Sequence, residues 1–158
     1  MRLSAGQLEL RLQSPAEVRA WIETLPPEVR VELSPAWIAR LDASTDPNPW
    51  TCGFEMIEPS SGAVVGTCAF VGPPDENSEV EIAYGVNEEH RGRGYATDAA
   101  VALAAFARTQ PDVRTVRAHT KPNNPASDRV LEKAGFQRAG EVEHPEDGLV
   151  TRWVFVVG

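Results

Sequence analysis

The sequence predicts a mixed α/β fold with one central sheet, and three observations lead to this prediction. Apolar residues occur at alternate positions in some segments, which is typical of strands, and along one face in others, which is typical of amphipathic helices. The predicted order is one strand, two helices, three strands, one helix, one strand, one helix and two strands. The length of 158 residues fits one domain, residues 1–158, and leaves little room for two.

The N-terminal part of the chain predicts one strand followed by two helices. Alternating leucines predict a strand over residues 1–12. Ser14, with a proline directly after it and Glu17 three residues on, is typical of a helix N-terminus, and the Pro26-Pro27 pair ends that helix. A second helix is predicted over residues 34–41, because its apolar residues fall on one face.

Beyond residue 50 strands dominate, and two helices interrupt them. The helix over residues 95–108 is the clearest in the chain because its apolar residues follow one face, and another helix is predicted over residues 125–134. Six further strands are expected at residues 50–57, 63–71, 79–86, 113–120, 136–143 and 150–157.

Composition and charge exclude several classes of protein. The chain holds 15 Lys plus Arg against 23 Asp plus Glu, a formal net charge of -8, which disfavours a nucleic-acid partner. No apolar run reaches the roughly 20 residues of a membrane span, and the N-terminus lacks the apolar core of a signal peptide. We therefore expect a cytoplasmic protein with no membrane partner.

The cysteines and histidines do not predict a metal site. Cys52 and Cys68 form no Cys-x-x-Cys pair, and we expect both to be buried thiols in strands. His90 and His144 lie in predicted loops without metal-ligand spacing. His119 ends a predicted strand, where it could act as a base, contact a substrate or hold a structural hydrogen bond.

A glycine-containing loop between a predicted strand and a predicted helix carries the most chemical information. The first backbone N–H groups of a helix lack internal partners and bear partial positive charge. Gly92 and Gly94 let a phosphate approach that backbone closely, and Arg91 and Arg93 add full charges, so the loop predicts an anion site. The Gly-Lys-Ser/Thr triplet of the Walker loop is absent, and the third glycine or alanine of the Rossmann fingerprint is missing from its register.

Two motifs together resemble the GNAT superfamily of acetyl-CoA-dependent N-acetyltransferases. One is Arg-x-x-Gly-x-Ala at residues 91–96, and the other is Asn-x-x-Ser at residues 124–127, continued by Glu-Lys-x-Gly-Phe at residues 132–136. The Asn-x-x-Ser form and the two early helices are similar to the branch that contains the ribosomal-protein N-terminal acetyltransferases. The resemblance implies the GNAT fold, a mixed, mostly antiparallel and splayed sheet of about seven strands flanked by about four helices.

The resemblance implies that acetyl-CoA is the cosubstrate; from the spacing of the cysteines and histidines we expect no metal. It implies that the pantetheine arm pairs with the strand at Gly85 and Val86, whose backbone polarises the thioester carbonyl; a glycine merely tolerated at a strand end is the alternative. It also implies a hydrogen bond from Asn124 to this arm, although Asn124 is equally placed to cap the next helix. The residues implied in pyrophosphate binding are Arg91, Gly92, Arg93, Gly94, Tyr95 and Ala96.

Glu81 and Ser127 are the candidate catalytic residues. Glu81 stands where some members of the superfamily carry a glutamate that accepts the amine proton, but Glu79 lies on the same predicted strand face and is its rival. A solvated carboxylate pair is the alternative. Ser127, near the thioester sulfur, is either an acid or an ordinary helix residue, because Leu131 replaces the tyrosine that many members use.

The function implied is transfer of an acetyl group from acetyl-CoA to a primary amine by direct attack within a ternary complex. A CoA-binding sensor or interaction module that has kept the fold and lost turnover is the alternative class. The acceptor is a small molecule or a protein N-terminus, and the acidic composition favours a cationic one. Trp21, Trp37 and Trp50 are expected in the core or around the acceptor, and a homodimer is left open.

Overall fold

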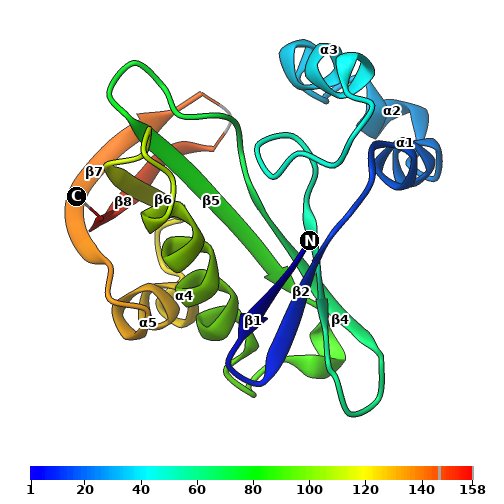
Figure 1. Cartoon of the computed structure of the whole chain (residues 1–158). Helices are drawn as coiled ribbons and strands as arrows, with labels where there is room; N and C mark the ends of the chain where they lie inside the picture. Colours follow the sequence, from blue (N-terminus) through cyan, green and yellow to red (C-terminus); the bar gives the residue numbers. More distant parts are fainter. Residues whose placement is uncertain (146, 158) are drawn as a thin grey trace.

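One mixed sheet forms the centre of the computed structural model, which describes residues 1–145 and 147–157 (Figure 1). Within these residues the strands are β1 (Arg2–Ala5), β2 (Leu8–Leu12), β3 (Phe54–Ile57), β4 (Val64–Phe70), β5 (Glu79–Val86), β6 (Thr115–Thr120), β7 (Gln137–His144) and β8 (Gly148–Val156). Their order in the sheet is β1-β2-β3-β4-β5-β6-β8-β7. Among the strand pairs of the described residues, only β5–β6 is parallel, so the mixed and mostly antiparallel sheet is confirmed.

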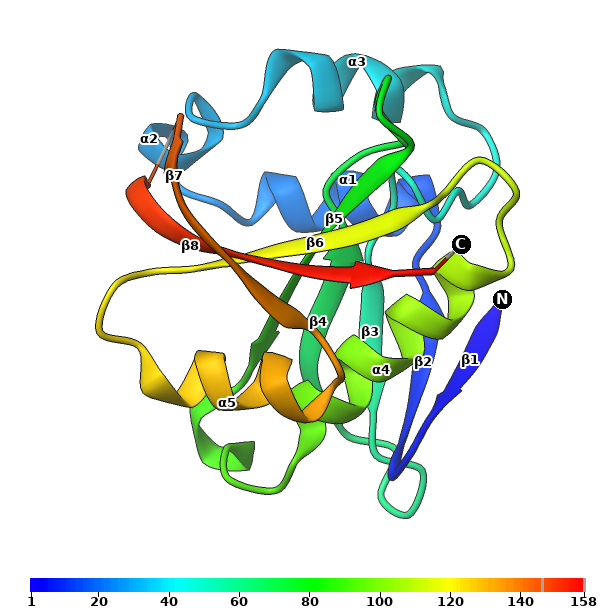
Figure 2. The ribbon, with the colours of Figure 1, turned by 90° about the vertical axis from the view of Figure 1, so that its left-hand side faces the viewer.

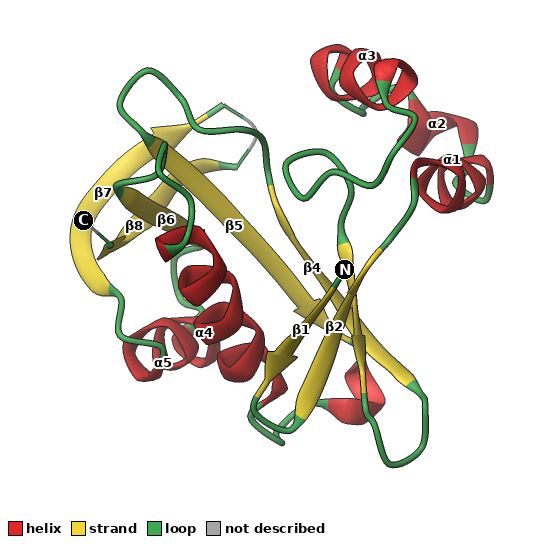
Figure 3. Cartoon of the chain, in the orientation of Figure 1, coloured by secondary structure: helices red, strands yellow, loops and turns green. Residues whose placement is uncertain are grey.

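Helices cover both sides of this sheet. The helices found in the described residues are α1 (Pro15–Glu23), α2 (Pro27–Arg30), α3 (Pro35–Ala43), η1 (Glu88–His90), α4 (Tyr95–Arg108) and α5 (Pro125–Lys133). Figures 1 and 3 show α4 and α5 together on one side, and α1, α2 and α3 on the other. None of these helices is long and apolar enough to cross a membrane.

The sheet splays in its middle, where β5 stops pairing with β6. On one side β5 pairs with β4 from Ile82 to Val86. On the other side it pairs with β6 only from Glu79 to Glu81, and the last matched pair is Glu81 with Arg117. Figure 2 shows β5 and β6 diverging from each other. The backbone of β5 beyond Glu81 therefore has no strand partner on its β6 side, as the resemblance implied.

The strand predicted over residues 1–12 is wrong, because these residues form the β1–β2 hairpin. Ala5 pairs with Leu8, and the two residues between them make the turn. Gly6 has a φ of +60°, the left-handed conformation that the first position of such a tight turn requires. The alternation of buried positions also shifts by one residue at this turn: Ala5 is buried before it, and Leu8, Leu10 and Leu12 are buried after it. This hairpin brings the number of strands to eight, one more than predicted.

Most other bounds shift by one or two residues, and two further differences from the sequence-based prediction are larger. The Pro26-Pro27 pair does not only end α1: Pro27 also begins α2, since a proline is suited to the first helical position. The strand predicted over residues 50–57 starts only at Phe54, because the N–H groups of Thr51 and Cys52 both donate to the carbonyl of Asn48 in a turn. The helix start at Ser14 is confirmed, with both hydrogen bonds of the capping box present.

The core lies between the sheet and α4. The bounds of β5 and α4 agree with the predicted 79–86 and 95–108. Small residues along one face of α4 let this helix pack closely on the strands, and those that are buried there include Ala99, Ala100, Ala104 and Ala107. The sheet face toward α4 supplies buried residues that include Leu10, Phe54, Met56, Ile82 and Val116.

Candidate active site

The loop that enters α4 forms a cradle of backbone N–H groups. Gly92 and Gly94 have φ values of +80° and +83°, a backbone conformation that favours glycine. Gly94 is the N-cap of α4 and offers no side-chain hydrogen bond, so the first N–H groups of this helix keep no capping partner. Arg91 and Arg93 lie on the same loop and add positive charge. The residues present fit a pyrophosphate group.

A cavity of about 550 Å³ lies over this cradle. One wall is the loop with the start of α4, and the other is α5 with Asn124 and Ser127. Tyr84, Gly85 and Val86 of β5 line the end nearest the middle of the sheet. All the residues expected at the cofactor lie around this cavity except Arg93, which stands on the loop outside the lining.

The turn of the first hairpin holds the cradle in place. Gln7 donates through its side chain to the carbonyl of Arg93 at 3.0 Å, and its backbone N–H donates to Asp98 Oδ2 at 3.2 Å. Gly6 passes so close to α4 that a Cβ there would lie 2.6 Å from the Asp98 carboxyl carbon. Sequence reasoning missed this contact, because it took residues 1–12 as one continuous strand.

A second turn supports the same loop from the other side. The Tyr95 hydroxyl donates to Glu58, in the turn between β3 and β4, and Arg93 lies 4.0 Å from this carboxylate. The hydrogen bond from Tyr95 is the main reason why the pKa of Glu58 lies below its usual value. The Tyr95 ring is buried, so this residue anchors the start of α4.

Hydroxyl groups of β5 and α5 meet at the inner end of the cavity. The Tyr84 hydroxyl and the Ser127 hydroxyl are 3.1 Å apart. Asn124 accepts a hydrogen bond from the Ser127 N–H at 3.2 Å, so it caps α5 and also lines the cavity. Leu131 is fully buried and lines neither cavity described here, so a tyrosine at that position would point into the core.

A second cavity of about 590 Å³ opens on the opposite side of the sheet, between β4, β5 and helices α1 and α3. Tyr84 and Gly85 line both cavities, at the point where β5 has left β6. A Cβ at Gly85 would meet nothing within 4 Å, so the backbone there faces open space. The absence of a side chain at Gly85 leaves room for a ligand at the junction.

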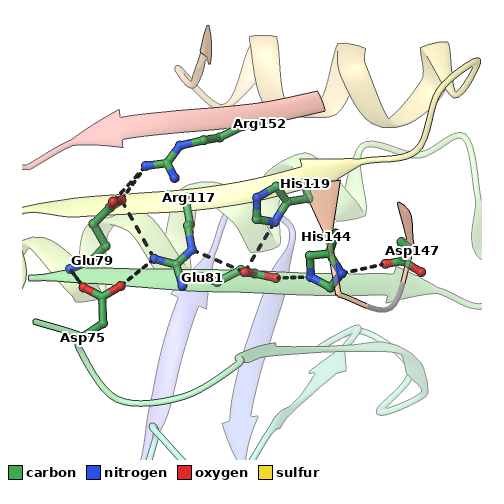
Figure 4. A network of polar contacts seen from close by, with 8 residues as sticks. All are labelled: Asp75, Glu79, Glu81, Arg117, His119, His144, Asp147 and Arg152. Carbon is green, nitrogen blue, oxygen red and sulfur yellow. Dashed lines mark hydrogen bonds and ion pairs between the residues drawn. The ribbon is translucent and has the colours of Figure 1, made fainter. Parts of the chain in front are cut away.

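The side chains of Glu79 and Glu81 lie in a polar row along β5 and β6 (Figure 4). Arg152 holds Glu79 with contacts of 2.6 and 2.8 Å to its two oxygens. Glu81 accepts a hydrogen bond from Arg117 Nε at 3.3 Å, and its same oxygen lies 3.4 Å from His119 Nδ1. The structure thus brings Glu81 and His119 together, whereas Glu79 is held mainly by Arg152 and lies 3.9 Å from Arg117, the residue that also contacts Glu81.

His144 joins this row from the end of β7 (Figure 4). Its Nε2 atom is 4.0 Å from Glu81, and its Nδ1 atom is 3.7 Å from Asp147. Among the described residues, Glu81, His119 and His144 are the group whose ligand atoms lie close enough to hold a metal ion, all within 4.8 Å. Arg117 donates to the same Glu81 carboxylate. The positive guanidinium would therefore repel a cation bound there unless the cation displaced it.

The cysteines are free and buried, as expected, but only Cys68 lies in a strand, because Cys52 belongs to the turn before β3. Burial raises the pKa of the Cys68 thiol to about 12, so this thiol is protonated near neutral pH. Cys68 borders the second cavity, whereas Cys52 lies in the core.

A splayed mixed sheet with an anion cradle at the start of its central helix is the architecture of N-acetyltransferases. The family model of the acetyltransferase (GNAT) domain matches residues 4–137, and the chain belongs to this family. The resemblance drawn from the two sequence motifs is therefore confirmed.

Proteins with a similar sequence or a similar structure are also named as acetyltransferases. The uncharacterized N-acetyltransferase YjdG of Bacillus subtilis (strain 168) is 31% identical over 115 residues, which are 69% of this chain. The chain spans 64% of the length of that relative. In structure, the chain is similar to RimL, a ribosomal L7/L12 alpha-N-protein acetyltransferase in complex with coenzyme A, with a TM-score of 0.74 and 15% identity over 99% of this chain and 98% of that one.

An aminoglycoside acetyltransferase has a similar fold as well. The structure of AAC(6')-Ib with paromomycin and acetyl-CoA matches with a TM-score of 0.67 and 21% identity, over 93% of this chain and 92% of that one. At these identities the two solved structures establish a shared fold, and their acceptors differ from each other.

Proposed function

We propose that the chain is one N-acetyltransferase domain that moves an acetyl group from acetyl-CoA to a primary amine, by direct attack within a ternary complex. The observation that carries this proposal is the meeting of two cavities at Tyr84 and Gly85. One cavity has an anion cradle, and the other opens on the opposite side of the sheet. A thioester at the junction would be reachable from both sides, so an amine could attack it without a covalent enzyme intermediate.

The cofactor side is assigned to the loop and the two β5 residues that follow Tyr84. Gly92 and Gly94 present backbone N–H groups to the pyrophosphate, and Arg91 and Arg93 add charge. Val86, whose backbone no strand covers on the β6 side, offers its N–H to the pantetheine arm and the thioester carbonyl, while its own carbonyl accepts from Arg91 Nε at 3.2 Å. Gly85, whose backbone pairs with Thr67 of β4, contributes the room that a side chain would fill. Asn124 lines the same cavity and can reach the arm while capping α5.

We assign the general base to Glu81 rather than Glu79. Ala83, which lines the second cavity, follows Glu81 on the same face of β5, about 7 Å along the strand. Glu79 lies two residues farther from Ala83 along β5, and Arg152 donates to both of its carboxylate oxygens. An amine near neutral pH must lose a proton before it attacks, and Glu81, with His119 beside it, accepts this proton directly or through a water molecule.

The leaving thiolate takes a proton from the hydroxyl pair of Tyr84 and Ser127. The amine nitrogen forms its bond to the carbonyl carbon, the carbon–sulfur bond breaks, and the hydroxyl proton moves to the sulfur. Burial raises the pKa of Tyr84, so its phenol stays protonated, and the Ser127 hydroxyl opposes this rise by stabilising the phenolate. Solvent in the open cavities then returns a proton to the pair.

Release of free thiol from acetyl-CoA in the presence of a panel of primary amines tests this function. We expect amine-dependent thiol release together with an acetylated amine detected by mass spectrometry. Acetyl-CoA binding without any amine-dependent thiol release would instead favour the sensor class. No binding of acetyl-CoA by calorimetry would contradict both.

A further inference from the structure

The second cavity has an uncharged lining. None of the described side chains that line it belongs to an aspartate, glutamate, lysine or arginine. Its two titratable members, Cys68 and Tyr84, are neutral near pH 7, because burial raises the pKa of both above their usual values. This differs from the chain as a whole, which carries a net charge of -8. An acceptor that enters the cavity therefore meets no full charge in its walls.

The walls are mainly aromatic and aliphatic. Trp21, Leu33 and Trp37 line the cavity on its helical side, and Phe70 at the end of β4 lines it together with Val71, the next residue. Trp37 is fixed in place because its indole N–H donates to the Thr51 carbonyl at 2.9 Å. Trp21 is 51% exposed, so an apolar group bound against it would remove apolar surface from water.

The carboxylates next to the cavity already have partners. Glu81 lies beyond Ala83 and bonds to Arg117, and Glu79 bonds to Arg152. One amino group at the Ala83 end can still reach Glu81, which is where the proton must go. A second ammonium group deeper in the cavity would find no carboxylate, and an unpaired charge in an apolar pocket is costly.

We propose that the acceptor is a primary amine on an apolar body that carries no second charge inside this cavity. This inference rests on the proposed function and narrows its substrate class. A free arylalkylamine and a chain N-terminus with an apolar first side chain share this chemistry. Polyamines and aminoglycosides do not, because they would bring several ammonium groups into an uncharged pocket. A free amino acid would bring its carboxylate.

Acetylation kinetics on five amines test the proposal. The panel contains 2-phenylethylamine, a short peptide that begins with phenylalanine, free phenylalanine, spermidine and kanamycin. We expect kcat/KM for one of the first two to exceed that for each of the last three by at least about tenfold. The better of the first two identifies the source of the amine, a small molecule or a chain N-terminus.

The outcomes separate this inference from the function on which it rests. Preferred acetylation of spermidine or kanamycin would overturn the inference and leave the function intact. Preference for free phenylalanine would also overturn it, and would point to Arg40, whose Nη2 lies 3.6 Å from where a Cβ of Gly72 would stand, just beyond Val71. No turnover of any amine would overturn both.

A charge introduced into the wall gives a second readout. Ser34 lines the cavity and caps α3, and aspartate is an equally good cap, so Ser34→Asp adds a carboxylate without removing the cap. We expect the ratio of kcat/KM for spermidine over 2-phenylethylamine to rise about two- to fivefold, the effect of a partly exposed ion pair. Ser14→Asp is the matched control, because Ser14 caps α1 outside the lining. An equal rise in both variants, or none in Ser34→Asp, would contradict the proposal.

Discussion

The hydroxyl oxygens of Tyr84 and Ser127 lie 3.1 Å apart, although 43 positions separate the two residues in the chain. Tyr84 comes from the strand that lines both cavities, and Ser127 comes from the first turn of α5. Their contact joins the α5 wall of the proposed cofactor site to β5 at the inner end of the cavity. It also places a phenol in the site, although position 131 holds no tyrosine and faces the core.

If the Tyr84 phenol supplies the proton to the leaving sulfur, Tyr84→Phe should lower kcat about tenfold to about a hundredfold. The KM for acetyl-CoA should change little, because phenylalanine keeps the ring that lines the cavities. Ser127→Ala should have a smaller effect, since it removes only the hydrogen bond to the phenol. Steady-state kinetics check both changes, and thermal unfolding shows whether either variant loses stability. A loss in Ser127→Ala with none in Tyr84→Phe would make Ser127 the donor.

The pH profile offers a sharper test of the same phenol. Burial raises the pKa of Tyr84 above its usual value, so activity that depends on the protonated phenol should fall only at strongly alkaline pH. The chain has two tyrosines, Tyr84 and Tyr95, so fluorotyrosine incorporated in a Tyr95→Phe background labels Tyr84 alone. Because fluorination makes a phenol more acidic, the alkaline limb should move to lower pH. A profile that does not move would remove the phenol from the chemical step.

Gly94→Asp should weaken acetyl-CoA binding by at least about tenfold, because it places a negative charge beside the proposed pyrophosphate site. The same change also strains the backbone, since Gly94 has a φ of +83°. Gly140→Asp is the matched control, with a φ of +98° and open space around it, away from the cradle. Calorimetric titration of acetyl-CoA compares the two variants. Equal affinity in both would show that the loop does not bind the pyrophosphate.

Glu81→Gln should lower kcat about 10²- to 10⁴-fold, the usual worth of a general base, and leave acetyl-CoA affinity nearly unchanged. Raising the pH should recover part of the loss, because more of the amine is then already deprotonated. Glu79→Gln should affect stability more than kcat, since it breaks the contacts with Arg152. A large loss of kcat in Glu79→Gln, with little change in Glu81→Gln, would reverse the assignment.

Glu17 should make the protein sensitive to acid. The pKa of Glu17 is lowered from 4.5 to about 2, mainly by the hydrogen bond from Arg11, with a further one from the Ser14 N–H. A carboxylate whose pKa falls on folding stabilises the folded state above its unfolded pKa. This contribution is therefore complete above about pH 4.5 and is lost as the pH falls toward about 2.

The measurement is the difference in Tm between the parent and Glu17→Gln, followed from neutral pH downward. We expect this difference to shrink as the pH drops below about 4.5. Glu23→Gln, on the same helix, is the control, because Glu23 forms no ion pair within the described part of the chain. A difference in Tm that stays constant with pH would contradict a role for the Arg11–Glu17 pair.

Local patterns in the sequence were enough to predict the elements that are fixed by interactions between residues close together in the chain. The Ser14 capping box, the bounds of β5 and α4, and the glycine loop before α4 could all be predicted. In each case the determining interactions lie within a few residues, such as a cap bonding to its own first turn. The two short motifs at residues 91–96 and 124–136 were specific enough to indicate the family, which the family model confirmed.

The tertiary structure decided which distant residues meet. Gln7 reaches Arg93 and Asp98 only because residues 1–12 turn back at Gly6, and Tyr84 meets Ser127 only because α5 packs beside the point where β5 leaves β6. The contacts of Glu81 with His119 and of Glu79 with Arg152 exist only because β5, β6 and β8 lie side by side in the sheet. Alternation along a strand tells which side chains share a face, but pairing between strands far apart in the chain tells which of them touch.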